Sequence, residues 1–163
     1  MIRCAKKEDL NAILAIYNDA IINTTAVYTY KPQTIDERIA WFETKQRNHE
    51  PIFVFEENGS VLGFATFGSF RPWPAYQYTI EHSIYVDASA RGKGIASQLL
   101  QRLIVEAKAK GYRTLVAGID ASNEASIKLY QKFNFKHAGT LTNVGYKFDY
   151  WLDLAFYELD LKD

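Results

Sequence analysis

A glycine-containing turn between an apolar strand and a long amphipathic helix is the feature that most constrains the fold of this chain. Residues 78–86 have the pattern of a strand, and residues 87–94, Asp-Ala-Ser-Ala-Arg-Gly-Lys-Gly, follow directly. A helix that ends at Gly111 is predicted by apolar residues at helical spacing, namely Ile95, Leu99, Leu100, Leu103, Ile104 and Ala107. Because residues 114–119 are a short apolar run typical of a strand buried on both faces, the segment predicts an α/β fold.

The first 50 residues predict a short strand at Ile2–Cys4 and two helices. Residues 10–21 carry apolar side chains three and four positions apart, which places them on one face of a helix. Thr34 followed by Glu37 is a capping box, and apolar residues at helical spacing continue a second helix to about Gln46.

Two antiparallel central strands are predicted at residues 52–55 and 61–67, because Asn58-Gly59 between them is a turn signal. The prolines of Arg71-Pro72-Trp73-Pro74 would remove donors from a strand ladder. Residues 68–76 are therefore expected to form a loop with unusually large side chains.

The C-terminal third predicts one more helix and two strands. Ser122 and Asn123 are capping residues for a helix that runs to about Phe133. Strands are expected around residues 137–142 and 151–161, where the alternation of apolar and polar residues is imperfect. There is no internal repeat and no linker, so residues 1–163 are expected to form a single domain.

The composition excludes several classes of function. The 19 Lys and Arg residues balance 19 Asp and Glu residues, which argues against a broad surface for nucleic acid. Cys4 is the only cysteine and no Cys/His cluster has the spacing of a metal site, so we expect no metal and a reducing environment. No window is long and apolar enough to cross a bilayer, and the N-terminus lacks the order of a signal peptide, so the cytoplasm is expected.

The turn at residues 91–96 has the chemistry of a phosphate site. Backbone N–H groups at the start of a helix are unpaired and carry the positive end of the helix dipole. The turn has neither the GxGxxG spacing of dinucleotide-binding proteins nor the GxxxxGK[ST] of P-loops. As Arg-x-x-Gly-x-Ala, with Arg91, Gly94 and Ala96, it resembles the pyrophosphate loop of the GNAT acetyltransferase superfamily.

The resemblance extends along almost the whole chain. Within the superfamily, the chain is similar to the phosphinothricin and methionine sulfoximine N-acetyltransferases in particular. It implies a mixed, mostly antiparallel sheet that is flanked by helices and splayed where acetyl-CoA enters. The matching segments keep one order: Ile16-Tyr17-Asn18-Asp19-Ala20, Asn23-Thr24-Thr25-Ala26, Arg71-Pro72-Trp73, Glu81-His82-Ser83, Arg91-Gly92-Lys93-Gly94, Asn123-Glu124-Ala125-Ser126 and Gly145-Tyr146-Lys147-Phe148.

The resemblance implies acetyl-CoA as co-substrate and assigns its contacts. Most residues of the turn before the long helix would contribute backbone donors to the pyrophosphate, Lys93 would add charge, and Asn123 would bind the pantetheine arm. Asn123 as a simple helix cap and Lys93 as a solvated surface lysine are the alternatives for those two positions. The cofactor residues are Ile84, Tyr85, Val86, Arg91, Gly92, Lys93, Gly94, Ile95, Ala96, Ser97, Asn123 and Ser126.

Direct attack of an amine on the thioester is the mechanism that the resemblance implies. An α-amino group with a pKa of about 8 is mostly protonated near neutrality, so a base is needed, and Glu81 is assigned to it, directly or through water. Backbone N–H groups near Tyr85 and Val86 would stabilise the oxyanion, and Tyr130 would protonate the leaving thiolate. A solvated strand carboxylate at Glu81 and a core tyrosine at position 130 are the alternatives.

The acceptor side is assigned to Arg71, Pro72, Trp73, Glu81, His82 and Ser83. Arg71 presents a planar fork for a pair of carboxylate, phosphinate or sulfonyl oxygens. Trp73 either contacts the acceptor or only packs, and His82 is expected to orient a neighbour because adjacent strand residues point to opposite faces. His49 and His137 have no clear role.

The expected function is N-acetylation of the α-amino group of a small amino acid or analogue, such as methionine sulfoximine, methionine sulfone or phosphinothricin. The alternatives are another small amine, a protein N-terminus, or an acyl-CoA-binding module without catalysis. Cys4 as an acyl-enzyme nucleophile is less consistent with the sequence than Cys4 as a small buried apolar residue. The aromatic tail from Tyr146 to Tyr157 either forms a homodimer, as the relatives suggest, or packs in the core.

Overall fold

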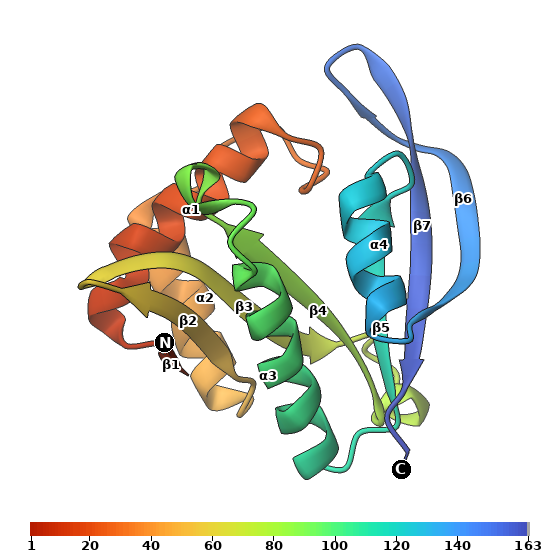
Figure 1. Ribbon diagram of the computed structural model, residues 1–163, viewed down its shortest axis with the longest axis horizontal. Coiled ribbons are helices and arrows are strands. Elements are labelled where there is room, and N and C mark those ends of the chain that lie inside the picture. Colours follow the sequence, from red (N-terminus) through yellow and green to blue (C-terminus); the bar gives the residue numbers. More distant parts are fainter. Residues whose placement is uncertain (163) are drawn as a thin grey trace.

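Seven strands form one mixed sheet in the order β1-β2-β3-β4-β5-β7-β6 (Figure 1). The computed structural model describes residues 1–162. Among these residues only β4 and β5 are parallel neighbours, and the other pairs are antiparallel. The strands are β1 (Ile2–Cys4), β2 (Ile52–Glu57), β3 (Ser60–Ser69), β4 (Thr79–Val86), β5 (Thr114–Asp120), β6 (Lys136–Lys147) and β7 (Tyr150–Asp160).

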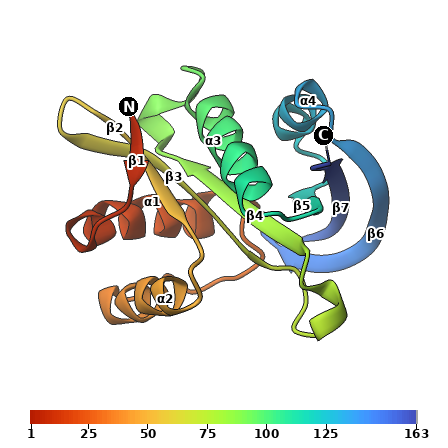
Figure 2. The ribbon, with the colours of Figure 1, turned by 90° about the horizontal axis from the view of Figure 1, so that it is seen from below.

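Four helices cover the two faces of the sheet. Helices α1 (Leu10–Asn23) and α2 (Ile35–Arg47) lie on one face, and α3 (Ile95–Ala109) and α4 (Glu124–Lys132) lie on the other (Figure 2). Because side chains of a strand alternate between faces, each strand in the middle of the sheet contributes to two separate cores. The α1/α2 core holds Leu10, Ile13, Ile16, Phe42, Ile52, Val54 and Phe64.

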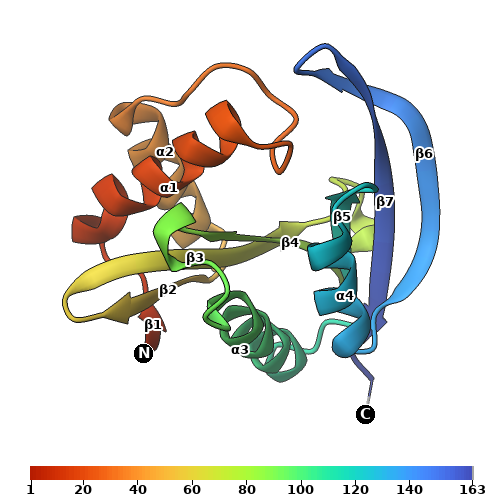
Figure 3. The same cartoon turned by 45° about the horizontal axis from the view of Figure 1, so that its top comes forward.

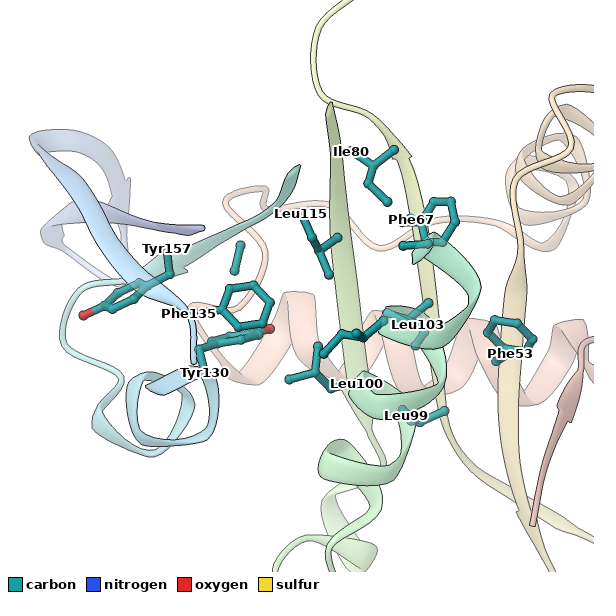
Figure 4. Packing of buried hydrophobic residues seen from close by; sticks show 14 of the residues in the cluster. Phe53, Phe67, Ile80, Leu99, Leu100, Leu103, Leu115, Tyr130, Phe135 and Tyr157 are labelled. Carbon is teal, nitrogen blue, oxygen red and sulfur yellow. The ribbon is translucent and has the colours of Figure 1, made fainter. Parts of the chain in front are cut away.

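The larger core lies under α3 and α4. Leu99, Leu100 and Leu103 of α3 are fully buried in a cluster that includes residues of β2, β3, β4 and β5. The same layer continues to Tyr130 of α4 and to Phe135, which follows it (Figure 4). Burial of a large apolar side chain contributes roughly 1.5–3 kcal/mol, so this layer fixes α3 and α4 against the sheet.

The α/β fold expected from the sequence is confirmed, and the local signals predicted most elements to within a few residues. The Thr34 hydroxyl accepts the Glu37 amide at 3.2 Å and the Glu37 carboxylate accepts the Thr34 amide at 3.0 Å, so the capping box is formed. The loop expected from residue 68 begins only after Ser69, because β3 continues to that residue, and it contains a short 3-10 turn at Pro74–Tyr76.

Two expectations need correction. Cys4 is exposed, because it lies on the short edge strand β1 where only three residues pair with β2. The strand expected at residues 137–142 extends to Lys147, because β6 is an edge strand that pairs with β7 through two register shifts while most of its side chains stay exposed. Exposed side chains on such a strand need not alternate, so its length left no signal in the sequence.

Candidate active site

The parallel strands β4 and β5 separate near the middle of the sheet. They pair only from Thr79 to Glu81 on β4 and from Thr114 to Val116 on β5. Beyond these residues β4 remains paired with β3 and β5 with β7, and the two strands diverge (Figures 1 and 3). The divergence leaves an opening in the sheet that is bordered by unpaired strand edges.

Backbone amides point into this opening from β4. Asp87 donates its amide to the Leu62 carbonyl on the β3 side at 2.8 Å. Because donors alternate along an antiparallel strand in regular register, the Tyr85 amide also points to β3, whereas the amides of Ile84 and Val86 point toward β5. The donors available for an oxyanion are therefore those of Ile84 and Val86, and of the two positions expected from the sequence only Val86 provides one.

The turn before α3 exposes further amides next to the opening. Gly92 and Gly94 have φ of 80° and 77°, a left-handed conformation that glycine adopts without steric cost. The first bond of α3 runs from the Gln98 amide to the Gly94 carbonyl at 3.2 Å, so Ile95, Ala96 and Ser97 precede that bond. Their amides, at the positive end of a 15-residue helix, form a cradle of the kind that binds phosphate groups.

A cleft of about 420 Å³ connects the turn with the opening between the strands. Asn123 caps α4 by accepting the Ser126 amide at 3.1 Å, so its side-chain NH₂ remains for a ligand. The lining residues are Ala20, Thr24, Thr25, Ala26, Ile84, Tyr85, Val86, Arg91, Ala96, Asn123, Ala125, Ser126, Leu129 and Tyr130. Eight of the residues predicted from the sequence thus meet in one cleft.

Glu81 is the last residue of β4 that pairs with β5, and its side chain lies on the face of the sheet that carries α1 and α2. Its carboxylate is half-buried, and Oε2 would be 3.0 Å from a Cβ placed on Gly118 of β5. Burial raises the pKa of Glu81 and the positive charge of Arg71 offsets part of that rise. A carboxylate with a raised pKa next to an opening in the sheet has the properties of a general base.

A second groove of about 590 Å³ lies on the same face as Glu81 and is open toward the loop that precedes β4. Its floor includes Val116, which pairs with Glu81, and its rim includes Arg71. Phe70, Tyr76 and Phe156 supply aromatic surface. A groove with one arginine and an aromatic lining is suited to a small molecule that carries a carboxylate.

Tyr130 and His82 lie on the opposite face from Glu81, under α4. The Tyr130 hydroxyl is 3.0 Å from His82 Nε2, and both side chains are buried. Burial lowers the pKa of His82 to about 4 and raises that of Tyr130 well above its usual value. A cavity of about 90 Å³ between the diverging strands is lined by both residues, and Tyr130 also lines the larger cleft.

Some residues predicted from the sequence line neither the cleft beside the turn nor the groove beside Glu81. Trp73 is 69% exposed and, like Pro72, lies outside the residues that line the groove beside Glu81. His82 belongs to the core face, and Ser83, which shares a face with Glu81, lines the small cavity. Lys93 is exposed on the turn.

Residues missed by the sequence reasoning complete the site. Thr24, Thr25 and Ala26, which follow α1, line the cleft, whereas the resemblance includes them only as part of a matching segment and gives them no role. Gly118 allows Glu81 to approach β5, because a Cβ at this position would come within 3.0 Å of its carboxylate, a tighter contact than side chains usually make. An isolated glycine inside an apolar strand was the one available signal.

Other features of the described residues do not compete with this site. A groove of about 710 Å³ at the far end of α3 contains none of the predicted site residues. Within residues 1–162, no group of three or more His, Cys, Asp and Glu side chains is placed to hold a metal ion. No helix in that range has the length and hydropathy needed to span a membrane.

Comparison with known proteins decides the family. The sequence profile of the acetyltransferase (GNAT) family matches residues 13–135, which include the cleft, the turn and Glu81. The chain belongs to the GNAT acetyltransferase family. This GNAT chain is therefore an N-acetyltransferase, and acetyl-CoA is its acetyl donor.

Three proteins that are similar in sequence or structure narrow the comparison within the GNAT family. The L-methionine sulfoximine/L-methionine sulfone acetyltransferase of Pseudomonas aeruginosa is 47% identical over 161 residues, 98% of this chain and 94% of that protein. The crystal structure of an N-acetyltransferase from Staphylococcus aureus Mu50 is 99% identical, covers 99% of this chain and 98% of that chain, and has a TM-score of 0.99. A phosphinothricin acetyltransferase from Sinorhizobium meliloti was solved in complex with acetyl-CoA. It is 35% identical with a TM-score of 0.95, and the match covers 98% of this chain and 87% of that chain.

The residues of the cleft fit acetyl-CoA. The amides that precede the first bond of α3 suit a diphosphate, and the open space around Gly92 and Gly94 leaves no side chain in its way. The unpaired edge of β4 and the NH₂ group of Asn123 suit a chain of amides such as pantetheine. When bound, acetyl-CoA supplies an activated thioester from which the acetyl group is transferred.

Proposed function

We propose that this protein acetylates the α-amino group of small amino acids or their analogues, with methionine sulfoximine, methionine sulfone and phosphinothricin as acceptors. The observation that carries the proposal is the position of Glu81 between the acetyl-CoA cleft and the groove that holds Arg71. The relative that is 47% identical is named for methionine sulfoximine and methionine sulfone. The more distant one is named for phosphinothricin.

In the proposed reaction, both substrates are bound together and approach the opening in the sheet from opposite faces. Glu81 accepts the proton of the acceptor amine, directly or through water, because burial keeps its pKa closer to neutrality. The amides of Ile84 and Val86 hold the oxygen on which charge develops. Tyr130, on the face of α4, donates a proton to the leaving sulfur.

Arg71 determines the class of acceptor in this proposal. Among residues 1–162 it is the only Lys or Arg side chain that lines the groove beside Glu81. A guanidinium binds two oxygens of a carboxylate or phosphinate at once. An α-amino acid held in this way would present its amine to Glu81.

The test is a thiol-release assay with acetyl-CoA and a panel of amino acids, run on the wild type and on Glu81→Gln. Loss of the base is expected to lower kcat about 100-fold near pH 7. The loss shrinks as the pH rises, because a growing fraction of the amine is then unprotonated without help. Equal losses at all pH values would contradict the role of Glu81, and absence of release with every acceptor would contradict the function.

Arg71→Ala is expected to raise the KM of the acceptor roughly 10- to 100-fold, the effect of losing a hydrogen-bonded charge, with little change in the KM of acetyl-CoA. The matched control is Arg47→Ala, which removes an exposed arginine from α2. An unchanged acceptor KM in Arg71→Ala would exclude this arginine from acceptor binding.

The remaining alternatives predict different results in the same assay. An enzyme for another small amine or a protein N-terminus would release thiol only with those acceptors. A non-catalytic acyl-CoA-binding module would bind acetyl-CoA in calorimetry without turnover. The half-buried carboxylate of Glu81 next to the cleft favours an enzyme over such a module.

A homodimer formed through the β6–β7 hairpin belongs to the same proposal. Strand β6 is a 12-residue edge strand, and such an edge invites pairing unless it is covered. The hairpin exposes large apolar side chains, namely Leu141, Val144, Tyr146, Phe148, Tyr150 and Trp151.

Trp151→Glu is expected to convert the dimer to a monomer in sedimentation analysis, because a charge would be placed in the apolar patch. Val105→Glu, at another exposed apolar position, on α3, serves as the control and should leave the mass unchanged. A wild type that sediments as a monomer at all concentrations would contradict the dimer.

Two further expectations complete the proposal. Residues 1–163 act as one domain, supported by a single sheet whose strands extend from Ile2 to Asp160. The protein acts in a reducing compartment such as the cytoplasm, supported by an exposed cysteine, Cys4, with no second cysteine to pair with.

A further inference from the structure

The imidazole of His82 and the phenol of Tyr130 form an isolated polar pair inside the larger core. Each is less than one-tenth exposed, and Nε2 lies 3.0 Å from the hydroxyl oxygen. The ring of Phe135 packs against both, with centroids 5.9 Å from His82 and 5.0 Å from Tyr130. Figure 4 shows the rings of Tyr130 and Phe135 side by side. A polar pair in such surroundings is costly unless it is used.

The other nitrogen of His82 indicates where the ring carries its proton. Nδ1 is buried and has no hydrogen-bond partner among the described residues. The backbone of Val116 lies near the ring and acts to raise its pKa, but it does not meet hydrogen-bond distance and angle at Nδ1. A buried N–H without an acceptor is rarer in proteins than an unused lone pair. We therefore place the proton on Nε2, which makes His82 the donor and Tyr130 the acceptor.

We propose that His82 is a positioning residue for Tyr130: by donating Nε2–H to the phenol oxygen, it turns the hydroxyl proton of Tyr130 away from the core and toward the acetyl-CoA cleft. The inference rests on the proposed function, in which Tyr130 protonates the leaving sulfur. Tyr130 lines both the cleft and the small cavity between the diverging strands, so a proton directed away from His82 has that space to enter.

The donated hydrogen bond also assists the transfer itself. The new N–C bond forms and the C–S bond breaks, its electron pair passes to sulfur, and the proton of Tyr130 converts the thiolate to a thiol. A phenol whose pKa is raised by burial gives up its proton to a thiolate reluctantly, since thiols have a pKa of about 8.5. Nε2–H stabilises the resulting phenolate, while Glu81 holds the proton lost by the amine, and solvent then restores both groups.

A neutral imidazole is required for this arrangement. Full burial lowers the pKa of His82 to about 4, so the ring stays uncharged at physiological pH. The charged or titratable groups that border the pair in the small cavity are Tyr85 and Asp120. Asp120 is itself held by Thr25 and by the amide of Ser122, so it is not free to protonate or deprotonate the ring.

The first test is a double-mutant cycle with His82→Phe and Tyr130→Phe. His82→Phe is expected to lower kcat roughly five- to tenfold, the effect of one hydrogen bond, without changing the acceptor KM or the Kd of acetyl-CoA. In the Tyr130→Phe background the same change is expected to alter kcat less than twofold, because its effect passes through the tyrosine. An equal loss in both backgrounds would show a merely structural role and overturn the inference.

His82→Gln guards against misfolding of the phenylalanine variant. The side-chain amide of glutamine carries a donor, and kcat is expected to recover to within about twofold of the wild type. If His82→Gln folds, as shown by its melting curve, but is as slow as His82→Phe, donation from Nε2 is not what matters and the inference fails.

A second readout does not depend on activity. In protein labelled with nitrogen-15 histidine, the ring shifts of His82, assigned by their absence from His82→Gln, are expected to place the proton on Nε2. A proton on Nδ1 would overturn the inference. If Tyr130→Phe keeps full kcat, the inference fails, while acetyl transfer by the wild type still supports the proposed function. Absence of any acetyl transfer by the wild type would contradict the proposed function instead.

Discussion

At the scale of single residues, burial gives adjacent positions on β4 opposite environments. Glu81 and His82 follow one another, and their side chains point to opposite faces of the sheet. Desolvation raises the pKa of Glu81 and lowers that of His82, so the uncharged form of each is favoured. One residue is thereby prepared to accept a proton, and its neighbour stays neutral near pH 7.

The buried imidazole predicts a stability that falls in mild acid. Unfolded His82 binds a proton near pH 6.5, whereas the folded residue does so only near pH 4, so the unfolded state binds more protons between these values. Lowering the pH from 7 to 5 should therefore cost the wild type about 2 kcal/mol from this group.

Urea unfolding of the wild type and of His82→Gln at pH 7 and pH 5 measures this contribution, because the other titrating groups are common to both proteins. Between pH 7 and pH 5, the free energy of unfolding should fall more for the wild type than for His82→Gln. Identical losses would show that His82 does not remain neutral in the folded protein.

At the scale of elements, the start of α3 combines a helix dipole with two glycines in left-handed conformation. Gly94 is the N-cap residue, with φ of 77°, and no side chain covers it. The same helix is followed by Gly111, with φ of 83° and equally open surroundings. The two glycines have similar backbone requirements, but only Gly94 belongs to the turn beside the cleft.

Gly94→Ala is expected to lower the free energy of unfolding by about 1–2 kcal/mol, because a Cβ strains the left-handed conformation. It should also raise the Kd of acetyl-CoA roughly tenfold by distorting the amide cradle. Thermal melting and calorimetric titration measure the two effects.

Gly111→Ala is the matched control and should show the loss of stability with an unchanged Kd. Equal effects of the two changes on acetyl-CoA binding would mean that the cradle at the start of α3 does not hold the donor.

At the scale of the whole molecule, the C-terminal hairpin holds the segment after α1 in place at the cleft. Lys147 of β6 is buried and donates to the carbonyls of Thr24 and Val27 at 2.7 and 2.8 Å. Tyr28 donates to the Asp153 carbonyl on β7 at 2.8 Å. Figure 3 shows this segment extending from α1 toward α4 and the hairpin.

Lys147→Met is expected to destabilise the protein by about 1–3 kcal/mol, since two partly buried carbonyls lose a charged donor. It should also weaken acetyl-CoA binding, because Thr24 lines the cleft. The control is Lys136→Met, an exposed lysine on the same strand, which should change neither. Calorimetry that gives the wild-type Kd for Lys147→Met would show that the hairpin does not shape the cleft.

The predictions that succeeded depended on local signals. The capping box at Thr34, the turn at Asn58-Gly59 and the glycines before α3 specify backbone conformation within a few residues, so their sequence patterns are sufficient. The extent of β6 failed because an exposed edge strand has no face that the core selects.

The sequence by itself determined most of the elements, the glycine turn before α3 and, through its resemblance to known acetyltransferases, the family. Only the tertiary structure decided where β4 and β5 separate, which amides of β4 are free, and that Glu81 and Tyr130 lie on opposite faces of the opening. The physical reason is distance along the chain. Lys147 binds Thr24 across 123 residues and His82 binds Tyr130 across 48, and no local pattern encodes pairs that only packing brings together.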